Sequence, residues 1–350
     1  MRRAVAFAVP GHLDTPTGGY AYDRRMVDAL RTQGWRVEVV DLGEGFPNPS
    51  ADGLARAGAM LAALDRQQPI VVDGLAFGAM PEAAAQLGTS RKLVALVHHP
   101  LAYESGLSPQ DAARLRESER AALAHARHVI VTSPATKRLV AGEYGVAAAD
   151  ITVVLPGSER LAREPRPQVQ TVSLLAVGSL APRKGYDILI AALATLQALP
   201  WQLRIAGDPT RDPATAQKLK ADIAAHGLTD RIALLGAVPV ERLRQLYAEA
   251  DAFVLASRFE GYGMAYAEAI AAGLPVIATR SGAIPDTVPA DASLLVAPDD
   301  AGALADALSR LICDAPLRAR LSQAARAAAL RLPTWEEAGT LFSKTLERYL

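Results

Sequence analysis

The sequence contains a single cysteine, Cys313, so no disulfide can form within the chain and a reducing compartment suits it. It also lacks a long apolar run, because no window approaches the roughly 20 apolar residues that cross a bilayer. The first apolar run, from Ala4 to Val9, is broken by Pro10 and Gly11 before it could form the core of a signal peptide. We therefore expect a cytoplasmic protein without a transmembrane segment, for which peripheral contact with the inner membrane face stays open.

Net charge is absent as well. The chain has 37 Lys and Arg against 37 Asp and Glu, so there is no overall field to attract nucleic acid, and we expect no nucleic-acid partner. An anionic substrate must instead be held by local groups. The N-terminal half lacks the strongly basic surface that binds anionic lipid tightly, which counts against a lipid acceptor without excluding one.

The chain does have a regular alternation of elements. Its 350 residues exceed the size at which one hydrophobic core stops growing, so we expect two domains. Short apolar runs alternate with longer Ala/Leu/Arg segments of helical period, a pattern typical of βα units on a parallel sheet. The predicted strands are Ala4–Val9, Arg36–Asp41, Ile70–Asp73, Lys92–Val97, His128–Thr132, Ile151–Val154, Ser173–Val177, Gln202–Ala206, Ile232–Leu235, Ala252–Leu255, Pro275–Ala278 and Ser293–Val296. The helical segments predicted between the strands of the first half are Tyr20–Gln33, Leu54–Gln67, Pro81–Gln86, Pro109–Ala126 and Ala135–Tyr144.

The segment from Pro156 to Thr171 interrupts this alternation with three prolines and little apolar content, which predicts an interdomain linker. The α/β pattern restarts after it. We predict an N-terminal Rossmann-like domain over 1–160, a linker over 161–171, a second Rossmann-like domain over 172–333 and a C-terminal helix over 334–350.

That last helix carries an apolar stripe that needs a surface to cover it. The stripe consists of Trp335, Ala338, Leu341, Phe342 and Leu346.

Two adjacent cations follow a strand of the second half. Arg183 and Lys184 lie between the strand Ser173–Val177 and the next helix, which places them at the carboxyl edge of the sheet, where open α/β sheets bind ligands. Cations there would neutralise a diphosphate. Such a pair is common on protein surfaces, so its position is what favours a binding role.

A stronger signal is the run SRFEGYGMAYAEAIAAGLPVIAT, in which two carboxylates bracket the start of a helix. Glu260 lies in a glycine-bearing loop and Glu268 lies eight residues later, inside the helix. The helix N-terminus near Gly263, Met264 and Ala265 can dock a phosphate, and the carboxylates on either side can accept hydrogen bonds from hydroxyls. The alternative is a solvated helix face, but Glu268 lies among small residues of buried character, where a carboxylate needs a partner.

Two features of the first half lie where a ligand could bind. Gly18 and Gly19 immediately precede a helix, and glycines there let the backbone approach a ligand closely, although a flexible entry loop is the simpler interpretation of this pair alone. His98 and His99 follow the strand Lys92–Val97, where successive side chains point opposite ways, so one of them is expected to face a cleft. No third ligand occurs at metal-like spacing, and we predict no metal site.

The motifs around Arg183, Lys184 and the span from Glu260 to Glu268, followed by AAGLPV, resemble glycosyltransferase family 4. The resemblance is strong over residues 172–312 and loose before them. It implies a GT-B fold, in which two Rossmann-like domains face each other across a cleft and the C-terminal helix crosses back to the N-terminal domain. It also implies retaining transfer of a hexosyl unit from a nucleoside diphosphate sugar, without a metal or other cofactor.

The resemblance assigns roles to individual residues. Arg183 and Lys184 contact the donor diphosphate, Glu260 contacts the transferred sugar and Glu268 contacts the ribose. The resemblance implies that Gly18 and Gly19 belong to a loop that contacts the donor. It also points to His98 rather than His99 as the residue that assists transfer. The catalytic set is therefore His98, Glu260, Arg183 and Lys184, and the donor-binding set is Gly18, Gly19, Arg183, Lys184, Gly207, Val238, Glu260, Gly261, Tyr262, Gly263, Met264, Ala265 and Glu268.

Three rival interpretations remain. An inverting GT-B transferase would differ in the anomer of its product, and a non-catalytic nucleotide-sugar binder would show no transfer. A two-domain dehydrogenase shares the same alternation, but its G-x-G-x-x-G fingerprint would follow the first strand, where this chain has PGHLDTPTGG. The acceptor hydroxyl, on a glycan, a lipid or a small molecule, is not specified by the sequence.

Overall fold

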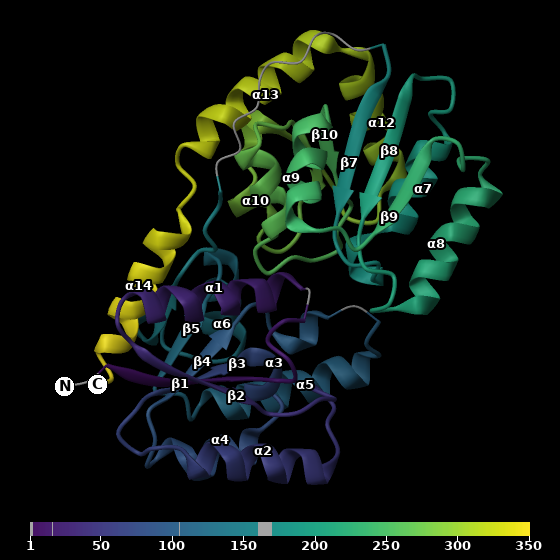
Figure 1. The fold of residues 1–350 in the computed structure, drawn as a ribbon. Helices are drawn as coiled ribbons and strands as arrows, with labels where there is room; N and C mark the ends of the chain where they lie inside the picture. The colour runs from purple at the N-terminus through teal and green to yellow at the C-terminus, as the bar shows by residue number, and fades with distance from the viewer. Residues whose placement is uncertain (1–2, 16, 105, 160–169) are drawn as a thin grey trace. The chain divides into compact units, whose positions relative to one another are not determined.

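A computed structural model describes residues 3–15, 17–104, 106–159 and 170–350. Its contacts divide the chain into an N-terminal unit, Met1–Gly157 with Pro333–Leu350, and a C-terminal unit, Ser158–Leu332 (Figure 1). The predicted linker 161–171 falls on residues 160–169, outside the described residues, apart from its last two positions. The predicted domain limits and the cleft between the domains stay predictions.

The described part of the N-terminal unit contains a six-stranded parallel sheet in the order β2-β1-β3-β4-β5-β6. The central strands β3, β4 and β5 are buried along their whole length, as expected where helices cover both faces of a parallel sheet. The strands are β1 (Ala4–Val9), β2 (Arg36–Asp41), β3 (Ile70–Asp73), β4 (Leu93–Val97), β5 (His128–Val131) and β6 (Ile151–Val153).

The helices of this unit follow the strands one by one. Side-chain oxygens of Thr17, Ser50, Ser108 and Ser133 cap four of them, which satisfies amides that helical geometry leaves unpaired. The elements are α1 (Gly18–Thr32), α2 (Ala51–Ala63), α3 (Gly74–Phe77), α4 (Pro81–Gly88), η1 (Leu101–Tyr103), α5 (Pro109–Leu123), α6 (Pro134–Glu143), η2 (Ala148–Asp150) and α14 (Trp335–Glu347).

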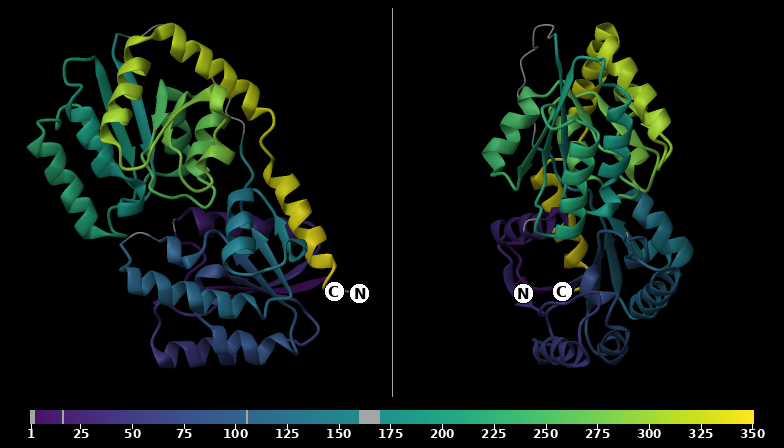
Figure 2. Two further views of the ribbon diagram at one scale, coloured as in Figure 1. Left: turned by 180° about the vertical axis from the view of Figure 1, so that it is seen from behind. Right: turned by 90° about the vertical axis from the view of Figure 1, so that its right-hand side faces the viewer.

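The C-terminal helix α14 belongs to the N-terminal unit and packs along α1, as Figures 1 and 2 show. Phe342 stacks on Phe7 of β1 with ring centroids 6.2 Å apart. The Trp35 indole N–H donates to the hydroxyl of Ser343 at 2.9 Å. The predicted crossover of the last segment is therefore confirmed. Leu341 was wrongly included in the buried stripe, because its side chain is 42% exposed.

The described part of the C-terminal unit contains a second six-stranded parallel sheet, in the order β12-β11-β10-β7-β8-β9. Its strands are β7 (Val172–Val177), β8 (Trp201–Ala206), β9 (Ile232–Gly236), β10 (Ala252–Val254), β11 (Val276–Thr279) and β12 (Ser293–Val296). Its helical elements are η3 (Pro182–Lys184), α7 (Tyr186–Ala194), α8 (Pro213–Ala225), α9 (Val240–Glu249), α10 (Met264–Ala271), α11 (Ile284–Thr287), η4 (Ala290–Ala292), α12 (Ala301–Cys313) and α13 (Ala315–Ala329).

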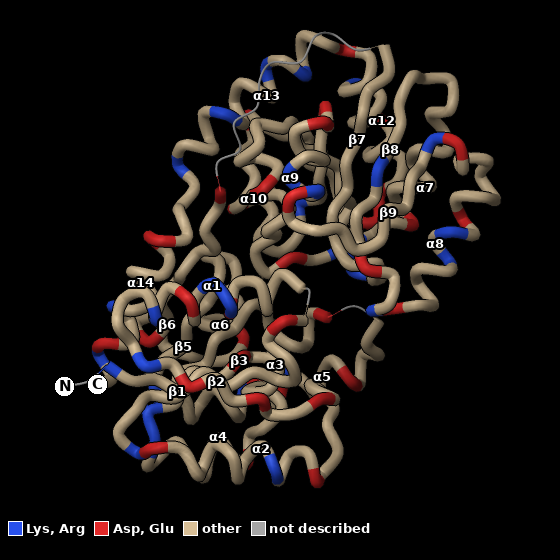
Figure 3. The backbone as a smooth tube through the Cα atoms, viewed as in Figure 1, with Lys and Arg blue, Asp and Glu red and all other residues tan. Residues whose placement is uncertain are grey.

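Charged residues of both signs are interspersed along the described chain (Figure 3), in keeping with the balanced composition. Among the described residues, no helix combines the length and the hydropathy that crossing a bilayer requires.

Glu119 on α5 has a buried carboxyl group, and its burial disfavours the charged form. One oxygen, Oε2, accepts a hydrogen bond from the Leu101 amide at 2.8 Å, and the other has no partner among the described residues. Burial raises the pKa of Glu119 to about 8, although the Leu101 amide opposes the shift. Because the pKa is higher in the folded than in the unfolded chain, the unfolding free energy should fall as pH rises from about 4.5 to about 8.

We therefore expect Glu119→Gln to be more stable than the wild type by on the order of a few kcal/mol at pH 9, and to have little advantage at pH 4.5. Urea unfolding at both pH values measures this. Glu117→Gln, an exposed change on the same helix, is the control. A Glu119→Gln protein that loses as much stability as the wild type between these pH values would contradict the assignment.

Candidate functional site

The sheet of the C-terminal unit reverses its strand order at β7. The chain runs outward from β7 to β8 and β9, and then returns to β10 on the other side of β7. Open α/β sheets bind ligands at this point of reversal, beyond the carboxyl ends of the strands. The loop after β7 carries Arg183 and Lys184, and the loop after β10 carries Glu260, so the topology brings both sequence motifs to this position.

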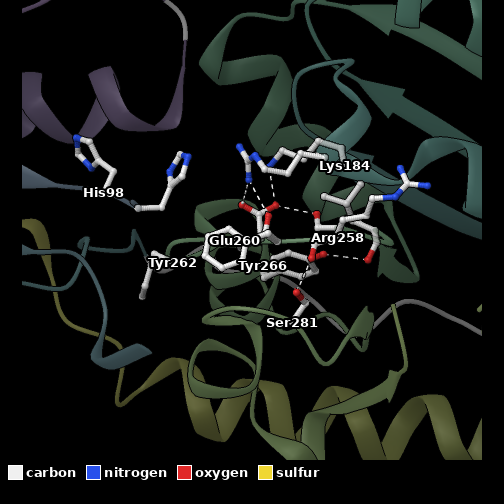
Figure 4. Close-up of polar contacts among 12 residues, drawn as sticks. His98, Lys184, Arg258, Glu260, Tyr262, Tyr266 and Ser281 are labelled. Carbon is white, nitrogen blue, oxygen red and sulfur yellow. Dashed lines mark hydrogen bonds and ion pairs between the residues drawn. The ribbon is translucent and has the colours of Figure 1, made fainter. Parts of the chain in front are cut away.

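Arg183, Lys184 and Glu260 form one ion-paired cluster (Figure 4). The Lys184 ammonium lies 2.7 Å from Glu260 Oε1, and an Arg183 guanidinium nitrogen lies 3.1 Å from Glu260 Oε2. The Ser257 hydroxyl donates to Glu260 Oε1 at 2.7 Å. Burial alone would raise the pKa of Glu260, but the two cations outweigh it and lower the pKa to about 2. Two cations and one anion leave a net positive charge for an anionic ligand.

Close backbone approaches hold the loops of this cluster against their neighbours. Gly185 has φ 64°, and a Cβ there would lie 2.0 Å from the carbonyl oxygen of Ala256. Gly282 has φ 54°, and its Cβ would lie 2.3 Å from the carbonyl oxygen of Glu260. Both positions therefore require glycine, because any side chain would separate the loops.

The residues predicted to dock a phosphate at the start of α10 lie next to Glu260 in the chain. Gly261, Tyr262 and Gly263 are buried, and Gly263 is the N-cap of α10. Met264 and Ala265 form the first turn of that helix, at its positive dipole end. The Tyr266 hydroxyl donates to the carbonyl of Leu255 at 2.9 Å and so ties α10 to the end of β10.

The Glu268 carboxylate has the hydrogen-bond partner that a carboxylate among apolar residues requires. It lies inside α10 and accepts a hydrogen bond at 2.8 Å from the hydroxyl of Tyr247 on α9. Burial raises the pKa of Glu268 to about 6, although the Tyr247 hydrogen bond opposes the shift. The carboxylate is therefore ionised at neutral pH and close enough to its pKa to titrate in mild acid.

Gly207 and Val238, two further residues predicted to bind the donor, lie at the same edge of this sheet. The Gly207 amide donates to the carbonyl of Gly236 at 2.9 Å, so the loop after β8 is bound to the end of β9. A Cβ on Gly207 would lie 2.0 Å from the carbonyl oxygen of Gly178, which follows β7. Val238 is partly buried against the core of the unit.

In the N-terminal unit, the glycine pair and His98 lie together. Gly18 and Gly19 are the first residues of α1 rather than residues ahead of it, and a Cβ on Gly19 would lie 3.3 Å from His98 Cδ2. His98 Nε2 lies 3.0 Å from Asp23 Oδ1 on α1 and 3.3 Å from Asp73 Oδ2 at the end of β3.

This environment favours the charged form of His98. Burial alone would lower the pKa of His98, but the carboxylates of Asp23 and Asp73 outweigh it and raise the pKa well above the ordinary value. The Asp23 side chain is fully buried. The three residues each offer an atom within 4.8 Å of the others, a spacing that also suits a metal ion. Because a protonated imidazole between two carboxylates already accounts for these contacts, we assign no metal to the cluster.

His99 differs from its neighbour in its contact. Its Nε2 lies 3.3 Å from a carboxylate oxygen of Glu104, which is 45% exposed. It therefore takes no part in the contacts of His98 with Asp23 and Asp73.

Sequence reasoning missed the residues that position these side chains, namely Asp23, Asp73, Tyr247 and Ser257. Asp73 is the last residue of a predicted strand, a signal that could have placed it at the carboxyl edge of the sheet. Asp23 and Tyr247 lie inside helices, and no motif distinguishes them from surface residues.

Two parallel Rossmann-like sheets with a C-terminal helix that returns to the first unit define the GT-B class of fold. The family model "Glycosyl transferases group 1" matches residues 158–328, and "Glycosyltransferase Family 4" matches residues 18–159. The chain belongs to this family of glycosyltransferases, so the predicted family, fold and enzyme class are confirmed.

Several characterised proteins are similar to the chain. The MMP alpha-(1->4)-mannosyltransferase of Mycolicibacterium hassiacum is 26% identical over 309 residues, which cover 83% of this chain and 73% of that protein. The mannosylfructose-phosphate synthase of Agrobacterium fabrum is 31% identical over 174 residues, which cover 45% of this chain and only 38% of that protein. The solved structure of a sucrose-phosphate synthase from Thermosynechococcus elongatus has the same fold, with a TM-score of 0.84, 23% identity and 99% of both chains covered.

Proposed function

We propose that this chain transfers a hexosyl unit, with retention of the anomeric configuration, from a nucleoside diphosphate sugar to a hydroxyl of a glycan, lipid or small-molecule acceptor. The observation that carries the proposal is the cluster of Arg183, Lys184 and Glu260 at the point where the strand order reverses. A net positive charge beside a helix N-terminus suits a diphosphate, and a buried carboxylate suits the hydroxyls of a sugar.

Each residue of the proposed site has its own role in the transfer. Arg183 and Lys184 stabilise the charge that develops on the leaving diphosphate, in place of a metal ion. Glu260 holds the transferred sugar, and Glu268 holds the ribose hydroxyls. The departing phosphate accepts the proton of the acceptor hydroxyl, and His98 hydrogen-bonds the sugar or orients the acceptor.

The donor can be identified through its effect on stability. A ligand that binds only the folded protein raises the melting temperature, so a panel of UDP-, GDP- and ADP-sugars, measured by thermal unfolding, should show stabilisation by one of them. Incubation with that donor should then release the nucleoside diphosphate, by transfer or by slow hydrolysis.

Each rival function predicts a different result. Stabilisation without release of the nucleoside diphosphate would indicate a binding protein rather than an enzyme. Nuclear magnetic resonance of the product anomer separates retaining from inverting transfer, and an inverted product would overturn the proposed stereochemistry.

Glu268 gives this proposal a pH test. We expect Glu268→Gln to weaken binding of the stabilising nucleotide sugar by roughly 1.5–3 kcal/mol at pH 8, because a charged acceptor is lost from the ribose hydroxyls. The wild-type carboxylate becomes protonated as pH falls through about 6, so the difference between the two proteins should shrink by pH 5. Calorimetric titration at both pH values measures it.

The matched control for this test is Glu241→Gln on α9, whose side chain is 77% exposed. Its affinity should equal that of the wild type at both pH values. An unchanged dissociation constant for Glu268→Gln at pH 8 would remove Glu268 from the donor site.

A further inference from the structure

Arg258 lies two residues before Glu260, and its guanidinium is engaged on every side. Two of its nitrogens lie 3.1 and 2.8 Å from the carboxylate oxygens of Asp187, in the first turn of α7. Its Nε donates to Asp299 at 2.7 Å, and a further hydrogen bond reaches the carbonyl of Pro182. Figure 4 shows Arg258 directed away from the Glu260 carboxylate, so it is not itself a member of the charged cluster.

The backbone of Arg258 joins the same loops. Its amide donates to the carbonyl of Arg183 at 2.7 Å. Its carbonyl accepts a hydrogen bond from the Ser281 hydroxyl, in the loop after β11. This one residue therefore links loops that follow four different strands of the sheet, and two of those loops carry the charged cluster.

Backbone strain is concentrated at one end of this network. Asp299, in the loop after β12, is the only non-glycine residue with positive φ among the described residues, at 58°. A left-handed conformation costs a non-glycine residue free energy and persists only where surrounding contacts hold it. At Asp299 the hydrogen bond from Arg258 Nε is one such contact.

Stability alone is a poor explanation for this arrangement. The side chains of Arg258, Asp187 and Asp299 are 29%, 45% and 57% exposed, and ion pairs at such exposure contribute little to folding. A guanidinium that binds one carboxylate through two nitrogens instead fixes the relative orientation of the two side chains. We propose that Arg258 is a positioning residue of the donor site, which holds Arg183 and Lys184 at the correct distance from Glu260 without touching the donor. This inference rests on the proposed function.

The test compares a nucleoside diphosphate with its nucleoside. UDP and uridine are titrated calorimetrically, and GDP with guanosine and ADP with adenosine are titrated in parallel. Arg258→Ala should weaken binding of the diphosphate by roughly 10-fold to 100-fold, the scale of one lost hydrogen bond to a charged group. Binding of the nucleoside should change less than twofold, because Glu268, the proposed ribose contact, and Val238 lie outside the loops that Arg258 joins. Arg258→Lys keeps the positive charge but cannot bind Asp187 through two nitrogens. Its affinity for the diphosphate should therefore lie between those of the wild type and Arg258→Ala.

Two further variants complete the design. Arg242→Ala removes a surface arginine that is paired with Glu249 on α9, and should bind UDP like the wild type. Asp299→Asn keeps a residue that tolerates left-handed backbone but removes the charge, so it should weaken diphosphate binding severalfold even where Arg258→Ala fails to fold.

The outcomes are distinguishable. Equal affinity of folded Arg258→Ala and wild type for the diphosphate would overturn the positioning role. Equal weakening of nucleoside and diphosphate would also overturn it, because that result indicates general loosening. A wild-type protein that binds none of UDP, GDP and ADP would instead contradict the proposed function.

Discussion

Replacing Glu260 with glutamine should lower the turnover number by roughly 10²- to 10³-fold, the scale seen when one charged or hydrogen-bonding group is removed from a preorganised site. The affinity for the nucleoside diphosphate product should not fall and is expected to rise. The reason lies in the cluster itself, where the Glu260 carboxylate is ion-paired with both Arg183 and Lys184. Its neutralisation raises the net charge that a diphosphate meets.

Steady-state kinetics with the identified donor and calorimetric titration with the nucleoside diphosphate measure the two effects. Glu249→Gln removes an acid that is paired with Arg204 and Arg242 on the surface, and serves as the control. Equal weakening of diphosphate binding and turnover in Glu260→Gln would mean that Glu260 mainly holds the two cations in place, and not the sugar.

His98→Ala should lower turnover by about 10²-fold or less at equal folded concentration, because a residue that only positions a substrate contributes less than one that transfers a proton. The structure favours positioning. A charged imidazole whose Nε2 is held by Asp23 and Asp73 has no free electron pair with which to act as a base. A loss near 10⁴-fold would instead indicate proton transfer.

His99→Ala is the internal control for this comparison and should keep nearly full activity. Because His98→Ala leaves two buried carboxylates without their cation, His98→Gln should be measured beside it to separate lost catalysis from lost stability. Full activity in His98→Ala together with loss of transfer in His99→Ala would show that the wrong histidine was chosen.

Much of the fold follows from the sequence because most strands are short apolar runs between breakers. The predicted strands Ala4–Val9, Arg36–Asp41 and Ser293–Val296 coincide with β1, β2 and β12. The short helix α3 was not predicted, since four residues are too few to show a helical period.

The candidate site was predictable only where it lies in one continuous motif. Glu260 and Glu268 belong to such a motif, whereas Arg258 gains its significance from Asp187 and Asp299, which are distant in the sequence. The environment of His98 was not predictable for the same reason. Neither Asp23 nor Asp73 is near His98 along the chain, yet these two buried carboxylates reverse the effect of burial on its pKa.

The return of α14 to α1 sets an order for biosynthesis. Ribosomes make the chain from its N-terminus, and domains tend to fold as they emerge. The N-terminal unit, however, includes Pro333–Leu350, whereas Ser158–Leu332 is one uninterrupted stretch. Until Phe342 and Ser343 are made, Phe7 and Trp35 lack the partners that cover them. The unit that is translated first is therefore completed last, and a nascent chain must keep that apolar face from aggregating while the whole C-terminal unit is synthesised.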